Sequence, residues 1–214
     1  MSRRPARNED LHGNAPDRSR AALLIIDMIN DLDFPENEHL LDQSAVLGGN
    51  IARLKARCGA IGIPTIYVND NWGKWRSDFH EVLKHCTDTR SPGCAMVRQV
   101  APQAEDYFVL KPKHSGFYAT PLDTLLRYIG VETVILTGIS ANSCIMLTAS
   151  DAYVRDLELF VPADCVAGQS DEEQARALDF MKDNFGVKTM PSDEIDLEKL
   201  LSAAEEEEPE AITR

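Results

Sequence analysis

The stretch TGISANSC, residues 137–144, decides the fold, because apolar runs of two different lengths meet there. VETVIL before it has the length and branched side chains of a buried strand, and IMLTASDAYV after it has the length of a buried helix. The stretch is therefore predicted to turn a strand into a helix whose first side chain is Cys144. Unpaired N–H groups and the positive end of the helix dipole lower the pKa of a thiol placed there, which makes it a better nucleophile.

Outward from this turn, strand-like apolar runs alternate with helix-like segments along the chain. The expected strands are AALLIID at 21–27, PTIYVND at 64–70, YFVL at 107–110, VETVILTG at 131–138 and GVKTM at 186–190, with a further strand carried by the segment DLELFVPADC at 156–165. The expected helices lie at 44–58, 77–85, 120–129, 144–155, 170–184 and 191–204. Continuous apolar strands separated by helices are typical of a parallel sheet that is covered on both faces. The sequence therefore predicts a three-layer, doubly wound α/β fold.

Length and composition fit one domain with polar ends. The 214 residues are 43% hydrophobic and 27% charged, which suits a single core at residues 21–204. The polar, proline-containing residues 1–20 are predicted to be a disordered N-terminal arm. Residues 205–214 are rich in glutamate and are predicted to be an acidic disordered tail.

Charge, hydropathy and cysteine usage exclude several classes of partner. A net charge of −13 argues against nucleic acid, because phosphate binding requires a basic face. No apolar run approaches the length of a membrane span, and the start of the chain is not of the secretory type. The five cysteines are odd in number and form no C-x-x-C pair, so we expect no disulfide framework and a cytoplasmic protein.

Three reactive residues, Asp27, Lys111 and Cys144, each follow the C-terminal end of an expected strand. These ends share one edge of a parallel sheet, so side chains distant in sequence can meet there. A carboxylate could take the proton of the thiol, and an ammonium group would stabilise both. The residues alone leave two alternatives open: Asp27 could merely cap the next turn, and Lys113 is the nearest rival to Lys111.

Three segments carry a resemblance to a known family: ALLIIDMIND, VLKPKHSGFYATPLDTLL and VILTGISANSCIMLTASDAYVRDLELFVPADC. Together they resemble the isochorismatase-like cysteine hydrolases, which include nicotinamidases and N-carbamoylsarcosine amidases. The resemblance spans about residues 21–168 and keeps the order acid, lysine, cysteine. It implies a six-stranded, Rossmann-like sheet and a catalytic triad of Asp27, Lys111 and Cys144, with Lys111 preferred because the lysine of the family directly follows a strand.

The same resemblance implies further features of the site. The peptide bond before Ser140 would be cis, and the backbone N–H groups of Ser140 and Cys144 would form an oxyanion hole. The protein would be a homo-oligomer, either a dimer or a tetramer. No organic cofactor would be needed for hydrolysis of a small-molecule substrate.

The sequence departs from the nicotinamidases at their metal site. Those enzymes carry a D-x-H-x-x-H motif after the second strand, where this chain reads NDNWGKW without histidine. His80 and His85 are five residues apart, which places them on different faces of a helix. We therefore expect no metal.

Polar and aromatic side chains near the expected sheet edge are candidates for substrate binding. They are Asn71, Trp72, His114, Phe117 and Tyr118. Asn71 and His114 could hydrogen-bond an amide or ureido group, although each could equally be structural. The long segment 71–106 could act as a lid or form an interface.

These features together predict a cysteine-dependent hydrolase of a small amide, imide, ureido or carbamoyl compound that works through a thioester. One alternative is a vinyl-ether hydrolase of the isochorismate type, or an ester hydrolase, on the same fold. Another is a catalytically silent α/β oligomer with a binding role.

Overall fold

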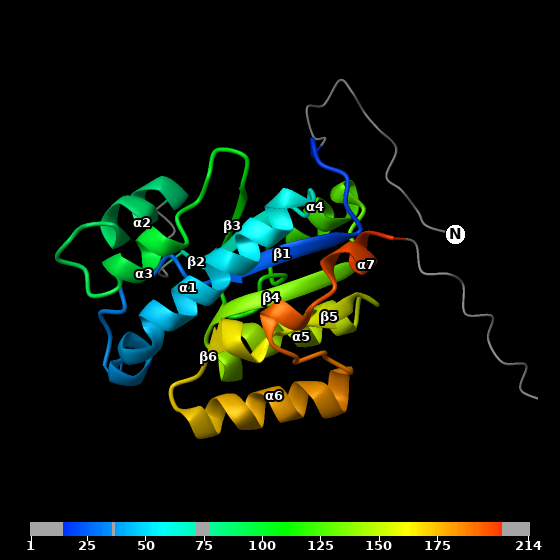
Figure 1. Ribbon diagram of the computed structural model, residues 1–214. Coiled ribbons are helices and arrows are strands. Elements are labelled where there is room, and N and C mark those ends of the chain that lie inside the picture. Colours follow the sequence, from blue (N-terminus) through cyan, green and yellow to red (C-terminus); the bar gives the residue numbers. More distant parts are fainter. Residues whose placement is uncertain (1–14, 36, 72–77, 203–214) are drawn as a thin grey trace, which may run out of the picture.

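The computed structural model describes residues 15–35, 37–71 and 78–202 (Figure 1). Its strands are β1 (Ala21–Ile26), β2 (Thr65–Asp70), β3 (Tyr107–Lys111), β4 (Thr133–Ile139), β5 (Glu158–Phe160) and β6 (Val166–Ala167). Its helices are α1 (Glu38–Ala60), α2 (Phe79–Cys86), α3 (Cys94–Gln99), α4 (Leu122–Ile129), α5 (Met146–Tyr153), α6 (Asp171–Phe185) and α7 (Leu197–Leu201). The strands and helices alternate over most of the chain, which confirms the predicted α/β class.

The six strands form one parallel sheet in the order β3-β2-β1-β4-β5, with β6 paired to β4. The chain winds outward from β1 in one direction and returns through β4 to wind in the other. The strand order therefore reverses between β1 and β4. In sheets of this kind, the crevice for a ligand opens at the carboxyl ends of the strands, at the point where the order reverses.

Side chains of β1 alternate between two cores, one on each face of the sheet. Leu23 and Ile25 pack in a core with α1, α2, α3 and α7, whereas Leu24 and Ile26 pack in a core with α4, α5 and α6. All four side chains are fully buried, which explains why the run is continuously apolar rather than alternating. Figure 1 shows α1 lying across one face of this sheet. The three-layer prediction is confirmed.

Of the last two predicted strands, the fifth is confirmed and the sixth was wrong. The segment 156–165 carries the fifth strand, as predicted, at Glu158–Phe160. The strand ends there because Pro162 has no N–H to continue the ladder and a short 3₁₀ turn follows at Ala163–Cys165. The expected sixth strand at 186–190 makes a single bridge, from Lys188 to Phe160. The sixth strand of the sheet is instead Val166–Ala167, which pairs with the end of β4.

Several helix boundaries also differ from the predicted ones. α1 begins at Glu38 rather than at residue 44, and the expected last helix divides into a turn at Ser192–Glu194 followed by α7. The segment 71–106 contains α2 and α3, while its residues 72–77 lie outside the described part of the chain. α6 begins as predicted, since the Ser170 hydroxyl accepts a hydrogen bond from the Glu173 N–H.

The ends of the chain are described only in part. Residues 1–14 and 203–214, most of the expected arm and tail, lie outside the described residues. Residues 15–20 contact the domain: the Tyr107 hydroxyl donates to Asp17, and the Ser19 N–H donates to the Ile129 carbonyl. Within the described ranges, no helix combines the length and the apolar character that crossing a membrane requires.

Candidate active site

Asp27 lies directly after β1, at the point where the strand order reverses. Its backbone adopts a φ of 53°, a left-handed conformation that is uncommon outside glycine and that often marks a functional position. One carboxylate oxygen accepts the Asp70 N–H at 2.7 Å, and the other lies 2.8 Å from the Lys111 ammonium. The side chain is 8% exposed. These contacts aim the carboxylate into the crevice rather than at the turn that follows, so a capping role does not describe it.

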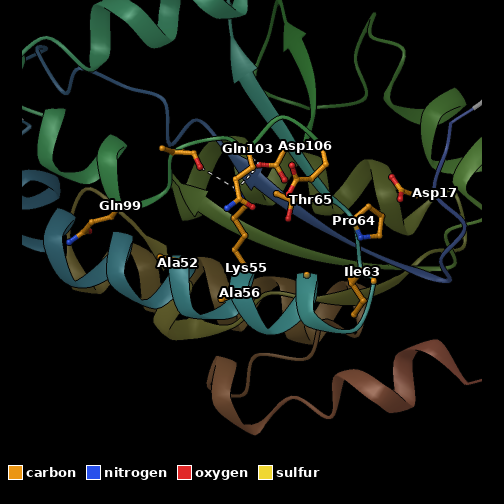
Figure 2. Close-up of a pocket in the computed structure, with 14 residues that line it drawn as sticks. Asp17, Ala52, Lys55, Ala56, Ile63, Pro64, Thr65, Gln99, Gln103 and Asp106 are labelled. Carbon is orange, nitrogen blue, oxygen red and sulfur yellow. Dashed lines mark hydrogen bonds and ion pairs between the residues drawn. The ribbon is translucent and has the colours of Figure 1, made fainter.

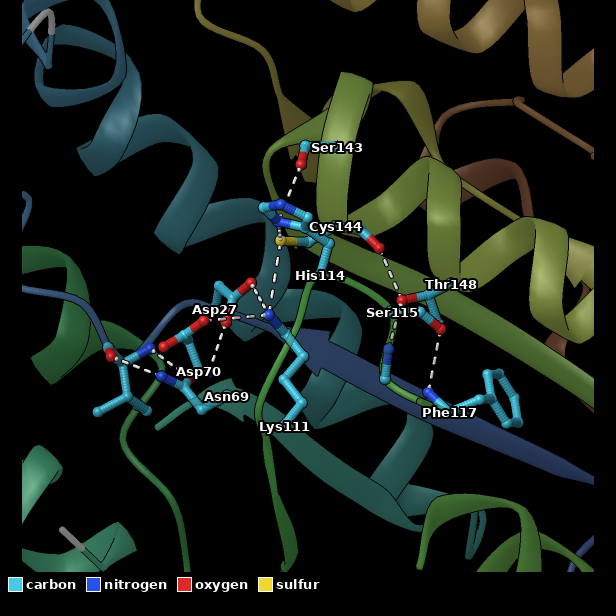
Figure 3. A network of polar contacts seen from close by, with 12 residues as sticks. Asp27, Asn69, Asp70, Lys111, His114, Ser115, Phe117, Ser143, Cys144 and Thr148 are labelled. Carbon is cyan, nitrogen blue, oxygen red and sulfur yellow. Dashed lines mark hydrogen bonds and ion pairs between the residues drawn. The ribbon is translucent and has the colours of Figure 1, made fainter. Parts of the chain in front are cut away.

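Lys111 is the last residue of β3, and its side chain is fully buried. Its Nζ lies 2.8 Å from Asp27, 3.5 Å from the Cys144 Sγ and 3.9 Å from Asp70 (Figure 3). Lys113, the rival lysine, is exposed. Pairing in the sheet explains the difference, because Lys111 still belongs to the ladder with β2 and is held over the carboxyl edge.

Cys144 lies in a wide, π-type helical turn, Ala141–Ile145, that precedes α5. Such turns are frequent at functional sites. The Ser140 carbonyl accepts the N–H groups of Ser143 and Ile145, and the Ile139–Ser140 peptide bond is cis, as the resemblance implied. Gly138 allows β4 to reach this turn, since a Cβ there would collide with the Ile26 carbonyl of β1.

The electrostatics of the three groups are dominated by burial. Burial raises the pKa of Cys144 to about 12, and the negative charge of Asp27 adds to this while Lys111 opposes it. The prediction of a lowered thiol pKa was therefore wrong, because desolvation outweighs the helix terminus. Burial also raises the pKa of Asp27 against the opposing charge of Lys111. For Lys111, burial lowers the pKa, but the charges of Asp27 and Cys144 outweigh it and the net shift is upward.

At neutral pH the thiol therefore holds its proton, and the lysine holds its charge. A nucleophilic attack by Cys144 requires a base to remove that proton as the new bond forms. Asp27 is hydrogen-bonded to the thiol and has a pKa above the ordinary carboxyl value, which makes it a stronger base than an exposed aspartate. The arrangement is thus suited to general-base activation rather than to a resting thiolate.

The expected substrate-binding residues lie at different distances from this centre. His114 lies against it, with Nδ1 3.3 Å from the Ser143 hydroxyl and 3.7 Å from the Cys144 Sγ. Asn71 is buried and extends the pairing of β2 with β3 through its N–H, which donates to the Lys111 carbonyl. Tyr118 is 57% exposed. Trp72 lies outside the described residues.

Phe117 is buried in the core on the α4–α6 face of the sheet, and its ring lies 4.5 Å from the Arg155 guanidinium. Its ring points away from Cys144 in Figure 3. The expectation that it lines the pocket is therefore corrected. The error arose because the sequence locates residue 117 near the sheet edge but does not reveal which way the loop after β3 turns.

Two polar residues at the end of β2, Asn69 and Asp70, belong to the site although sequence reasoning did not single them out. The Asn69 amide accepts the Ile29 N–H and donates to the Ile29 carbonyl, which anchors the segment after Asp27. Asp70 places a second carboxylate near Lys111. The signal was present, because β2 ends in polar residues at the same edge as the acid that ends β1.

Across residues 15–35, 37–71 and 78–202, no three His, Cys, Asp or Glu side chains gather closely enough to bind an ion. The His80 ring lies beside Phe79 and Phe108, whereas His85 pairs with Asp31 at 2.9 Å. The two histidines therefore serve different local contacts.

A cavity of about 440 Å³ lies elsewhere, between α1 and the amino ends of β2 and β3 (Figure 2). Lys55 crosses it to Asp106 at 2.5 Å and also donates to the Tyr67 hydroxyl and the Ala101 carbonyl. Thr65, the first residue of β2, lines it. This cavity is at the opposite edge of the sheet from Cys144, so it takes no part in the chemistry of that residue.

The sequence is similar to known proteins along most of its length. The family model described as the Isochorismatase domain matches residues 21–193. The uncharacterized isochorismatase family protein YaaI of Bacillus subtilis is 41% identical, over 75% of this chain and 88% of that protein. The ureidoacrylate amidohydrolase RutB of Methylobacterium radiotolerans is 30% identical, over 81% of this chain and 76% of that protein.

Solved structures give the same result. The N-carbamoylsarcosine amidase from Thermoplasma acidophilum matches with a TM-score of 0.63 and 28% identity, over 83% of this chain and 99% of that chain. Some curated relatives are longer: the chain spans 54% to 61% of the proteins named Isochorismatase and Enterobactin synthase component B.

Proposed function

This chain belongs to the isochorismatase family, and from that premise we propose that it is a cysteine-dependent hydrolase of a small amide, imide, ureido or carbamoyl compound. The family includes hydrolases of amides and related bonds, as the names of RutB and of the Thermoplasma amidase state. One observation carries the proposal for this chain. The Cys144 sulfur lies 3.5 Å from Lys111, whose ammonium is itself paired with Asp27 at 2.8 Å.

The proposed reaction begins with transfer of the thiol proton of Cys144 to Asp27 as the sulfur attacks the substrate carbonyl. The oxyanion of the tetrahedral intermediate is received by the backbone N–H groups of Ser140 and Cys144, as the resemblance implies. Asp27 then gives its proton to the leaving nitrogen, and an amine or ammonia departs. A thioester on Cys144 remains.

Hydrolysis of the thioester reverses these roles. Asp27 takes a proton from water, the hydroxide attacks the thioester carbonyl, and the thiolate leaves and regains the proton. Lys111 keeps its charge throughout and offsets the negative charge that builds on the sulfur. His114, 3.7 Å from the sulfur, and Asn71 are proposed to hydrogen-bond the amide or ureido group of the substrate. This sequence of steps uses no cofactor.

The substrate class can be tested by ammonia release. Over a panel of primary amides, carbamoyl compounds and ureido compounds, we expect at least one class to release ammonia, and an enzyme-coupled assay measures it. With a slow substrate, intact-mass spectrometry should detect the acyl group on the protein, and digestion should locate it on Cys144. An acyl adduct on Cys144 is expected because the sulfur of this residue is the atom that attacks the substrate carbonyl.

The rival activities give different outcomes in the same experiments. A vinyl-ether hydrolase would cleave an isochorismate-type substrate without an acyl adduct on Cys144. A catalytically silent protein would release no ammonia, and its Cys144 would react with iodoacetamide no faster than the other four cysteines. We expect Cys144 to react first, since the other four are buried.

The pH profile is expected to follow the ionisation of Asp27. Only the carboxylate can accept the thiol proton, so kcat/KM should fall as the pH decreases through the pKa of Asp27. Because burial raises that pKa, the fall should be centred above 3.8, the ordinary value for aspartate. Kinetics from about pH 4 to pH 8, with circular dichroism at each pH, measure this.

The matched control for this profile is Asp33→Asn, which removes an exposed carboxyl in the same loop after β1. This variant should keep the acid limb, whereas Asp27→Asn should lose activity at every pH. An acid limb centred at or below 3.8 in the folded parent would contradict the assignment of Asp27 as the base.

The quaternary structure and location remain predictions. We propose a homodimer or homotetramer, as the resemblance implies, which light scattering on the purified protein can test. A cytoplasmic location is the expectation from cysteine usage.

A further inference from the structure

A row of polar side chains begins at the candidate nucleophile, in the turn before α5, and continues along one side of α5 to just beyond its end. Cys144, Thr148, Asp151 and Arg155 follow one another at intervals of four, three and four residues. These intervals place side chains on the same side of a helix. The three residues after Cys144 all contact the β3–α4 loop, residues 112–121, or the start of α4.

Thr148 makes the contact nearest to the thiol. Its hydroxyl accepts the N–H of Gly116 at 3.0 Å and donates to the carbonyl of Cys144 at 2.6 Å. The side chain is fully buried, so water does not compete for either bond. One hydroxyl therefore joins the backbone of the loop after β3 directly to the backbone of the nucleophile.

Gly116 allows this close approach. A Cβ on residue 116 would lie 2.9 Å from the Val68 side chain, 3.2 Å from Leu122 and 3.5 Å from Thr148. The loop backbone thus packs against β2, α4 and α5 at a separation that a larger residue would not permit. The contact of Thr148 with the loop is built into the packing and does not depend on a flexible side chain.

A second link lies one turn further along α5. The Ser115 hydroxyl donates to the Asp151 carboxylate at 2.5 Å and accepts the Phe117 N–H at 3.2 Å. Arg155 pairs with the same carboxylate at 3.3 Å and covers the Phe117 ring at 4.5 Å. The loop is therefore held to α5 at two successive turns.

The loop held in this way starts immediately after Lys111 and carries His114. In Figure 3 the Cys144 sulfur lies between the His114 imidazole and the Asp27–Lys111 pair. A change in the separation of the loop from α5 would move His114 relative to the sulfur. In a site of this kind, a misplacement of about 1 Å lowers the rate by roughly 100-fold.

We propose that Thr148 is a positioning residue, whose hydroxyl sets the distance of the β3–α4 loop, and with it His114, from the Cys144 sulfur. It acts through two backbone groups and does not touch the substrate. This inference rests on the proposed function in assigning Cys144 as the nucleophile. It goes beyond that function because it makes the geometry of the catalytic groups depend on the buried hydroxyl of Thr148, a residue that is not one of those groups.

The test compares Thr148→Val, which keeps the shape but loses the hydroxyl, with Thr148→Ser, which keeps the hydroxyl. With a substrate found in the amide panel, Thr148→Val should lower kcat by about 10- to 100-fold with KM changed less than about threefold. Thr148→Ser should stay within about threefold of the parent in kcat. Alkylation of Cys144 by iodoacetamide, measured at that residue by mass spectrometry, should slow in Thr148→Val only.

The matched control is Thr133→Val, at the amino end of β4. Its hydroxyl is also buried and donates to a side chain, Glu158, but it lies at the far end of the strand from the turn that holds Cys144. This variant should keep the parent kcat and alkylation rate while losing thermal stability. If Thr148→Val matches Thr133→Val in both kcat and alkylation, the inference is overturned.

Two further outcomes are separable. If Thr148→Val does not fold, Ser115→Ala tests the inference instead, because it removes the second link between the loop and α5. This variant should lower both kcat and the alkylation rate of Cys144. A kcat and an alkylation rate equal to those of the parent would overturn the inference. If Cys144→Ala retains activity, the proposed function fails by itself, while alkylation still tests whether Thr148 sets the environment of the thiol.

Discussion

Cys144→Ala is expected to lower kcat by about 10⁴- to 10⁶-fold, since it removes the atom to which the acyl group would be transferred. The carboxylate and the lysine would remain but would have no thiol to activate. The side chain is small, only partly buried and located in the turn at the carboxyl edge of the sheet, so the fold should persist. Initial rates at saturating substrate, together with thermal unfolding of both proteins, measure the effect.

The control for this substitution is Cys58→Ala, which removes a fully buried thiol from α1. It makes the same chemical change far from the site, so it should cost some stability and leave kcat unchanged. Activity that survives in Cys144→Ala would rule out a thioester mechanism and favour direct attack by water, as a vinyl-ether hydrolase would require.

Lys111→Met is expected to damage both stability and catalysis. The ammonium is fully buried against Asp27, so its loss leaves a buried carboxylate without its counter-charge. Breaking a buried ion pair from one side typically costs about 3–5 kcal/mol. The remaining carboxyl should then take up a proton and cease to act as a base, which lowers kcat/KM at neutral pH by about 10²- to 10⁴-fold.

The pH dependence of that loss has a definite sign. The charge of Lys111 lowers the pKa of Asp27, so the substitution should raise it further. A carboxyl whose folded-state pKa exceeds its unfolded value contributes stability below the unfolded pKa and loses it as the pH rises through the folded one. The deficit of Lys111→Met should therefore be small near pH 4 and grow toward neutral pH.

Urea unfolding of the parent and of Lys111→Met at acidic and neutral pH measures this difference. Lys113→Met is the matched control, because it removes an exposed lysine two residues along the same segment. It should change stability by less than about 0.5 kcal/mol. Equal effects of the two substitutions would show that the buried pair does not contribute as described.

Much of the site could be predicted because it depends on strand ends. A buried strand of a parallel sheet reads as a continuous apolar run, and the residue that closes it is visible as the first polar one. Asp27 and Lys111 were found in this way, and the parallel sheet places both ends on one edge. Distances could not be predicted, since they depend on how far each side chain reaches over that edge.

Errors arose where competing local signals had similar strength. The segment 186–190 has strand-like residues, yet only Lys188 reaches β5, and the two-residue strand at 166–167 is too short to produce a pattern. The pKa of Cys144 was predicted to be lowered, because the start of a helix can be recognised in the local sequence. Burial, which raises this pKa, cannot be recognised there. Desolvation depends on the whole set of surrounding atoms.

The sequence by itself determined the alternation of strands and helices, the turn at residues 137–144 and the three reactive residues at strand ends, because each of these is a local pattern of polarity and chain length. Only the tertiary structure decided the order of the strands, the 2.8 Å pairing of Lys111 with Asp27 and the hydroxyl of Thr148 that joins the loop after β3 to Cys144. The ion pair joins residues 84 positions apart, and the hydrogen bond of Thr148 with Gly116 joins residues 32 positions apart. Such contacts are set by packing across the sheet, which no window of the sequence contains.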